Sequence, residues 1–201
     1  MNNGPSTLDR CPRVSEKINK SRHTRESITV KTLQEVTADE AWLRKYPERT
    51  VLAVSIDGAG RPNIITLGWN MPTSHNPSMA VISIGVTRYS HRLIHEGGEF
   101  VLVFPSIEIE EEVLYCGTHS GREVDKFKET GLTPLPSKYV TPPLIKEGVV
   151  NMECKVVGEL RTGDHTIFAG EILTAYISKE HKKILFNMGR DEQGKRKFRG
   201  F

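Results

Sequence analysis

The chain has 201 residues, 37% of them hydrophobic, which is typical of one globular domain or of one domain with a tail. Its formal net charge of +3 is small for this length and argues against an obligate nucleic-acid-binding protein. Residues 1–27 lack the apolar core of a signal peptide, and no window is as long and apolar as a membrane span. We therefore expect a cytoplasmic protein with neither a membrane nor a nucleic acid as its partner.

The first residues differ in composition from the rest of the chain. Residues 1–27 are polar, mixed in charge and poor in large apolar side chains, which predicts a flexible N-terminal extension. The predicted folded domain spans residues 28–201. Within it, Ile28–Val36 alternates weakly and is either a first strand or a covering segment. Ala38–Lys45 is predicted to be a short helix that Pro47 ends.

Two apolar runs follow, Val51–Ile56 and Asn63–Trp69. The Gly-rich linker 57–62 joins them, which predicts a β-hairpin. The second run continues into a polar segment that contains two prolines and extends to Pro77. We predict that this segment is a loop with unpaired backbone N–H and C=O groups. Either water or a flat, polar-edged ligand is then needed to satisfy them.

Strand-like runs rich in Val, Ile and Phe continue to the end of the chain. They are Met79–Ile84, Phe100–Phe104, Val149–Leu160, Thr166–Ile177 and Ile184–Met188. Two helical regions interrupt them, Ser90–His95 and residues 107–129. Because the strands and helices do not alternate as βαβ units, the pattern favours a mainly β, antiparallel barrel with short helical insertions over a doubly wound sheet.

Several common chemistries lack their motifs. The chain has no GxSxG, no Walker lysine loop, no HExxH and no GxGxxG that opens a helix. Cys11, Cys116 and Cys154 are odd in number, widely spaced and without a CxxC pair, which indicates reduced thiols. Neither nucleophilic hydrolysis nor a metal site is predicted.

The strand that ends at Trp69 and the polar segment after it carry the first candidate binding residues. Their amide and hydroxyl groups could meet the carbonyl and ring-nitrogen edge of a heterocycle, and the Trp69 ring could cover one of its faces. The candidates are Asn63, Thr66, Trp69, Asn70, Thr73 and Ser74. The alternative is a polar surface loop with Trp69 in the core.

Residues 87–94 place arginines and a hydroxyl where a helix begins. The first N–H groups of a helix, together with Arg88 and the Ser90 hydroxyl, form an anion site suited to a phosphate. In the alternative, Ser90 simply caps the helix and the arginines are solvated.

Two single residues complete the candidate site, Lys126 and His165. Lys126 follows a turn at Gly121 and opens a helix, where its charge could neutralise a phosphate or a reduced ring. His165 follows a Gly-Asp turn at the start of a strand, where it can hydrogen-bond or stack at a ring edge. The alternatives are a solvated lysine and a structural histidine.

Four segments, in this order and spacing, resemble the flavin reductase-like family. They are PNIITLGWNMPTSHNPSMAVISIG from Pro62, RYSHRLIHEGGEFVLVFP from Arg88, SGREVDKFKETGL from Ser120 and GDHTIFAGEI from Gly163. The closest likeness is to the flavoredoxin-type FMN-binding proteins, and it covers the chain from about Tyr46 to the C-terminus.

The resemblance implies an antiparallel, Greek-key split β-barrel that binds FMN non-covalently, in a homodimer with FMN near the interface. It also implies that Asn63 and Trp69 contact the flavin, and that Ser90 stands where the family has a phosphate-binding threonine. Lys126 and His165 match further FMN contacts. Phe198 matches an aromatic residue that closes over the flavin, and movement of the tail that carries it could gate the ring.

Two classes of function remain open. The resemblance implies an oxidoreductase in which electrons pass from NAD(P)H or a protein donor through FMN to free flavin, ferric iron or a protein acceptor. No catalytic side chain beyond bound FMN is then expected. The alternative is a non-enzymatic electron-transfer flavoprotein that does not use a nicotinamide. The missing GxGxxG only weakly disfavours the enzyme, because a nicotinamide can stack on a flavin without a Rossmann unit.

Overall fold

A computed structural model describes residues 33–201, and Ala38–Phe201 forms one compact unit. The predictions for residues 1–27, for Cys11 and for residues 28–32 lie outside the described residues. Residues 33–37 form no helix or strand. The first helix, α1, spans Ala38–Trp42 and is shorter than predicted. None of the helices in the described part of the chain is both long and apolar enough to cross a membrane.

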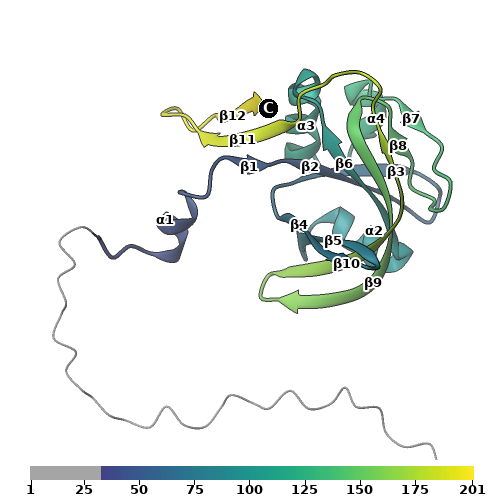
Figure 1. The fold of residues 1–201 in the computed structure, drawn as a ribbon, viewed down its shortest axis with the longest axis horizontal. Helices are drawn as coiled ribbons and strands as arrows, with labels where there is room; N and C mark the ends of the chain where they lie inside the picture. The colour runs from purple at the N-terminus through teal and green to yellow at the C-terminus, as the bar shows by residue number, and fades with distance from the viewer. Residues whose placement is uncertain (1–32) are drawn as a thin grey trace, which may run out of the picture. The chain divides into compact units, whose positions relative to one another are not determined.

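Seven antiparallel strands form the main sheet, in the order β3-β2-β6-β9-β10-β5-β4 (Figure 1). Their bounds are β2 Val51–Ile56, β3 Pro62–Leu67, β4 Asn70–His75, β5 Ser78–Gly85, β6 Glu99–Pro105, β9 Gly148–Thr162 and β10 His165–Ile177. The two long strands β9 and β10 pair with each other, and β10 also pairs with β5. The mainly β, antiparallel architecture expected from the sequence is confirmed.

The barrel closes at a short corner between β3 and β4. β3 pairs with β2 at one edge of the sheet, whereas β4 pairs with β5 at the other. Only Gly68 and Trp69 separate β3 from β4, and the Trp69 C=O accepts a hydrogen bond from the Ser83 N–H in β5 at 3.0 Å. The prediction of an unpaired loop after Trp69 is therefore wrong, because β5 pairs with the backbone of Asn70–His75.

Each face of the main sheet buries its own hydrophobic core. Side chains alternate between the faces of a strand, so Val51 and Ala53 of β2 belong to one core while Leu52 and Val54 belong to the other. This explains why the run VLAVSI is apolar without alternation. One core holds Phe100 and Phe168, and the other lies where the helices pack.

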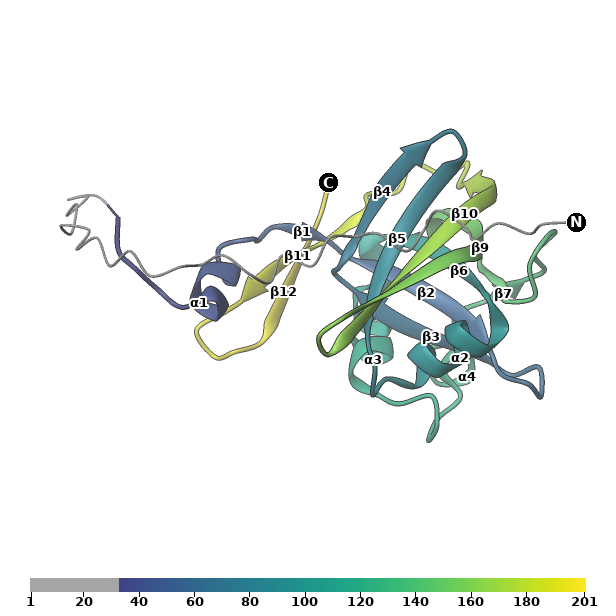
Figure 2. The ribbon, with the colours of Figure 1, turned by 90° about the horizontal axis from the view of Figure 1, so that it is seen from below.

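Three helices, which Figure 2 labels, and a 3₁₀ turn interrupt the strands. They are α2 Tyr89–Gly97, the 3₁₀ turn η1 Ile107–Ile109, α3 Glu110–Thr118 and α4 Lys126–Thr130. α3 and α4 both contact β3. Two short strands, β7 Pro134–Leu135 and β8 Leu144–Ile145, pair with each other nearby. The predicted helical regions are thus confirmed in outline, with breaks between their parts.

A second, three-stranded sheet has the order β1-β11-β12. It joins β1 Glu48–Arg49 to β11 Leu185–Arg190 and β12 Arg196–Gly200. Figure 1 shows β11 and β12 beside α3, away from the β9–β10 hairpin. The sequence predicted β11 but not β12, and this second sheet supplies one side of the site described next.

Candidate functional site

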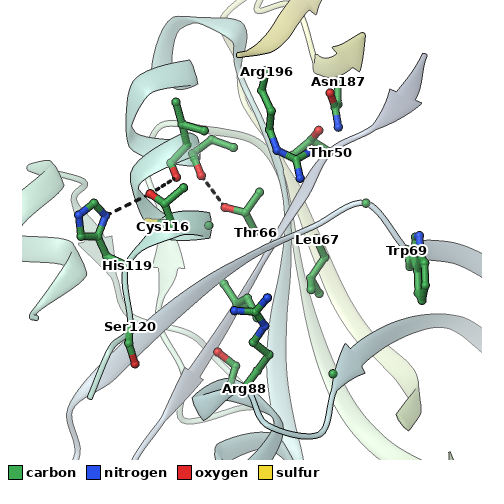
Figure 3. A pocket seen from close by; sticks show the side chains of 18 of the residues that line it. Thr50, Thr66, Leu67, Trp69, Arg88, Cys116, His119, Ser120, Asn187 and Arg196 are labelled. Atoms are coloured by element: carbon green, nitrogen blue, oxygen red, sulfur yellow. Dashed lines mark hydrogen bonds between the residues drawn. The ribbon is translucent and has the colours of Figure 1, made fainter. Parts of the chain in front are cut away.

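A cavity of about 700 Å³ lies between β3, the start of α2, the end of α3 and the second sheet (Figure 3). We call it the main cavity. Binding sites for small ligands and cofactors typically measure roughly 300–1,000 Å³, so this volume suits one cofactor. The polypeptide segments around it are far apart in the sequence, from Lys45 to Phe198.

Most of the residues predicted from the sequence meet at the main cavity. The lining includes Asn63, Thr66, Trp69, Arg88, Ser90, Lys126, His165 and Phe198. Asn70, Thr73 and Ser74 do not line it, because they lie on the edge strand β4. The Asn70 amide donates instead to the Gly68 C=O at 3.1 Å. The predicted binding role of these three residues is not supported by their position.

One end of the main cavity is the start of α2, with Arg88 and Ser90. We call it the phosphate end. Arg88 is the N-cap residue, and its side chain makes no capping hydrogen bond. Ser90 lies in the first turn and is buried, and its hydroxyl accepts a hydrogen bond from the Asn63 amide at 2.7 Å. The alternative in which Ser90 caps the helix is therefore wrong.

The amide of Asn63 is paired at one end only. Asn63 is 3% exposed, and within the described part of the chain its Oδ1 has no hydrogen-bond partner. Gly121 packs directly on it, since a Cβ at position 121 would overlap Oδ1 and lie 2.7 Å from the Asn63 Cγ. Because an amide oxygen only accepts hydrogen bonds, the partner that Oδ1 lacks is a donor and not a phosphate oxygen.

Replacing Gly121 with alanine is expected to weaken ligand binding at the phosphate end by at least tenfold. The new methyl group would push the Asn63 amide away from Ser90, while the rest of the fold stays intact. Gly97→Ala is the matched control, because no atom lies within 4 Å of a Cβ at that position. Equilibrium titration with FMN, alongside thermal unfolding, measures both effects. Equal FMN affinity in the two variants would contradict this prediction.

Lys126 is buried and not solvated, which rules out the alternative considered for it. It is 4% exposed, and its ammonium donates to the Ile64 C=O at 2.6 Å and to the Cys116 C=O at 2.7 Å. Burial lowers the pKa of Lys126 below its ordinary value of 10.5; the nearby Cys116 opposes this shift and Arg88 adds to it. One of its three N–H groups remains for a ligand.

Trp69 and His165 form an aromatic wall. Their ring centroids are 4.7 Å apart with an interplanar angle of 39°, and Trp69 is 49% exposed. Trp69 is therefore not a core residue. His165 Nδ1 lies 2.7 Å from the Asp164 carboxylate, and this hydrogen bond lowers the pKa of Asp164. The carboxylate thus orients the imidazole beside the indole.

The opposite end of the cavity contains residues that the sequence did not indicate. They are Glu48, Thr50, Asn187, Arg190 and Arg196. The Glu48 carboxylate pairs with Lys45 at 2.7 Å and accepts a hydrogen bond from the Asn187 amide at 3.3 Å. The turn after Arg190, with an aspartate and Gly194 at φ 77°, is the signal that could have revealed β12 and its arginine.

Phe198 is a fixed part of the wall. It lies in β12 opposite Asn187 of β11, and its side chain packs against one of the two cores. A gating motion would have to separate two paired strands, so the structure does not support the predicted mobile tail.

Cys116 also lines the main cavity. It is buried, and burial raises the pKa of its thiol to about 11. The neutral thiol is a poor nucleophile.

The chain is similar to several known proteins in sequence and in fold. A protein 48% identical over 128 residues, uncharacterised, occurs in Archaeoglobus fulgidus; the match covers 64% of this chain and 71% of that one. An NADH-dependent FAD reductase of Streptomyces globisporus is 26% identical over 142 residues, covering 70% of this chain and 77% of that one. The crystal structure of a flavoredoxin from Methanosarcina acetivorans superposes with a TM-score of 0.72 at 25% identity, over 84% of this chain and 92% of that chain.

The family model described as the flavin reductase like domain matches residues 43–195, which include most of the lining of the main cavity. The fold is accordingly the split barrel that the sequence resemblance implied. The chain therefore belongs to the flavin reductase-like domain family.

Proposed function

We propose that this chain binds FMN non-covalently in the main cavity and acts as a flavoprotein oxidoreductase. The observation that carries the proposal is the phosphate end. There the exposed Arg88 and the buried Ser90 hydroxyl, which accepts from the Asn63 amide and keeps its own O–H to donate, meet at the start of a nine-residue helix. A helix N-terminus beside a guanidinium is suited to a phosphate dianion.

The residues present fit FMN on three counts. The cavity volume of about 700 Å³ suits a cofactor of this size. The aromatic wall of Trp69 and His165 offers a face for a flat ring, and the donors at the phosphate end match a single phosphate.

The protein's own contribution is binding and orientation. Arg88, Ser90 and the first N–H groups of α2 would hold the phosphate and so fix where the ring lies. Trp69 and His165 would line one face of the ring, and the remaining N–H of the Lys126 ammonium would be available to the cofactor. Bound FMN would supply the redox chemistry, since its isoalloxazine ring accepts electrons from a donor and passes them on.

Purified protein is expected to be yellow, and the protein freed of cofactor should quench the fluorescence of added FMN. Arg88→Gln should raise the Kd for FMN at least tenfold, because a charge-assisted hydrogen bond contributes roughly 1.5–3 kcal/mol. Arg92→Gln is the matched control. Arg92 lies on the same helix, pairs with Glu96 and does not line the cavity. A colourless protein that leaves FMN fluorescence unchanged would refute the proposal.

We further propose NAD(P)H as the electron donor, with FMN near the interface of a homodimer. The name of the Streptomyces relative supports a nicotinamide donor. The homodimer is supported by exposed apolar surface of the kind that dimers bury, at the half-exposed Trp69 and at Met71 of β4. Stopped-flow mixing with NADH and NADPH tests the donor. Reduction by a protein donor alone, with no bleaching of the flavin by either nucleotide, would favour the electron-transfer carrier.

A further inference from the structure

Two arginines face each other across the pair β11–β12. Arg190 and Arg196 are direct partners in the antiparallel register, and both line the main cavity. Like charges at such positions repel each other. Arg190 donates to the Gly194 C=O at 2.6 Å, and across residues 33–201 neither guanidinium forms an ion pair with a carboxylate. This unneutralised pair of charges suits an anionic ligand.

The arginine pair lies at the opposite end of the main cavity from the phosphate end. In Figure 3, Arg196 points into the cavity from the second sheet, next to Thr50 and Asn187. Arg88 enters from the other side, beyond Thr66. The cavity therefore has two cationic ends. FMN carries one phosphate, so it can occupy only one of them, and the second end is left for the anion of another ligand.

A second groove of about 670 Å³ adjoins the arginine pair, between α3 and β12. It shares Leu114, Thr118, His119, Arg196 and Phe198 with the main cavity, so the two spaces meet between the end of α3 and Arg196. Tyr115 and His119 lie in its wall as a stacked pair, with ring centroids 3.8 Å apart and an interplanar angle of 15°. Such a stacked pair offers aromatic surface to a planar base.

We propose that Arg190 and Arg196 bind the phosphoryl groups of a nicotinamide dinucleotide. Its nicotinamide enters the main cavity, and its adenosine half lies in the second groove by Tyr115 and His119. Bidentate guanidinium groups are well suited to phosphoryl oxygens. The inference rests on the proposed function, because the nicotinamide end needs a bound flavin to meet.

Isothermal titration of the FMN-loaded protein with NAD⁺ and, separately, with NADP⁺ tests this site. Arg190→Gln and Arg196→Gln should each raise the Kd for the dinucleotide at least tenfold, and should leave the Kd of the cofactor-free protein for FMN within twofold. Arg199→Gln is the matched control, since Arg199 lies on the same strand, near the Phe201 ring, and lines neither space. If both dinucleotides lose affinity, the arginines bind the diphosphate that NAD⁺ and NADP⁺ share. If only NADP⁺ loses affinity, the arginines bind its 2′-phosphate.

Three results would overturn the inference. The first is a dinucleotide Kd that stays within twofold in both variants, and the second is an FMN-loaded parent protein that binds neither dinucleotide. The third is a weaker FMN affinity in Arg196→Gln, which would place the FMN phosphate at this end. A parent protein that fails to bind FMN is a different outcome, because it refutes the proposed function before any variant is compared.

Discussion

Glu153→Gln is expected to lower the free energy of unfolding by about 3 kcal/mol. The substitution replaces a buried carboxylate, which accepts several hydrogen bonds, with a neutral amide that has only one acceptor oxygen. Glu153 is fully buried in β9. Its two oxygens accept hydrogen bonds from the backbone N–H groups of Lys138, Tyr139 and Val140 and from the Tyr176 hydroxyl. An amide would turn its NH₂ group toward one of these donors, and the segment after β7 would lose its attachment to the barrel.

The same carboxylate sets a pH dependence. Burial by itself raises the pKa of Glu153, but the hydrogen bonds from residues 138–140 and Tyr176 outweigh burial and lower this pKa below its ordinary value of 4.5. The folded protein therefore binds the proton less readily than the unfolded chain does. The resulting stability is present above the ordinary pKa and is lost as the pH falls through the lowered pKa.

Chemical denaturation at several pH values measures both effects. The difference in unfolding free energy between parent and Glu153→Gln should be greatest near neutral pH and should shrink below pH 4.5. Glu99→Gln is the control, since the Glu99 carboxylate accepts one N–H from Thr141 of the same segment at an exposed site. It should cost less than about 1 kcal/mol. Equal losses in the two variants would contradict the account given for Glu153.

The sequence predicts those strands well whose order of apolar and polar residues follows from the burial of their side chains. The strand β2 is apolar at successive positions because its two faces contact two different cores, and its hairpin partner β3 follows after a Gly-rich turn. The long pair β9–β10 is also predicted, with its turn at Gly163. Here burial explains only the part of each strand that contacts a core, because Val157, Leu160 and Ile177 are apolar and yet exposed.

The edge strand β4 could not be predicted in this way. Most of Asn70–His75 is exposed, so its polar side chains carry no hydrophobic period. Pro72 normally excludes a strand, but β4 pairs only with β5, which leaves its other edge without a partner strand, and the register shifts between Pro72 and Ser74. Because the pairing comes from β5 and not from its own side chains, a polar loop was the natural but wrong prediction.

Only part of the candidate site could be predicted, because some of its residues reach the cavity through strand pairing that the sequence does not reveal. Asn63, Ser90 and His165 lie in segments that resemble the family, and the fold brings them to one cavity. Arg190 and Arg196 flank the polar residues 191–195, which carry charges of both signs and no hydrophobic period. Only the pairing of β11 with β12 places both arginines at the cavity, and that pairing depends on the second sheet as a whole.

Lys126 shows most clearly what a motif leaves undecided. The family resemblance implies a flavin contact, whereas the structure shows a buried ammonium that joins two elements. Ile64 lies on the edge strand β3, and Cys116 lies in the last turn of α3, where carbonyls lack a partner within the helix. A positive charge at this end of α3 also complements the helix dipole. A purely structural role would account for burial of the lysine without any ligand.

Lys126→Met is therefore expected to lower the free energy of unfolding by about 2–4 kcal/mol, because two buried carbonyls would lose their donor. If the third N–H of Lys126 also contacts FMN, the Kd of the folded variant for FMN should rise tenfold or more. Denaturation of the cofactor-free protein and FMN titration under native conditions separate these two roles. Lys128→Met is the control, because Lys128 is exposed on the same helix and outside the cavity.

Each combination of results has a distinct meaning. A loss of stability with an unchanged Kd would show that Lys126 only links β3 to α3, and the flavin contact implied by the family resemblance would be wrong. A raised Kd with unchanged stability would contradict the structural role that its two hydrogen bonds indicate. Both losses together are the expected result. A residue that holds the wall of the site in place would then also bind the ligand, so that the free energy of FMN binding adds to the stability of the barrel.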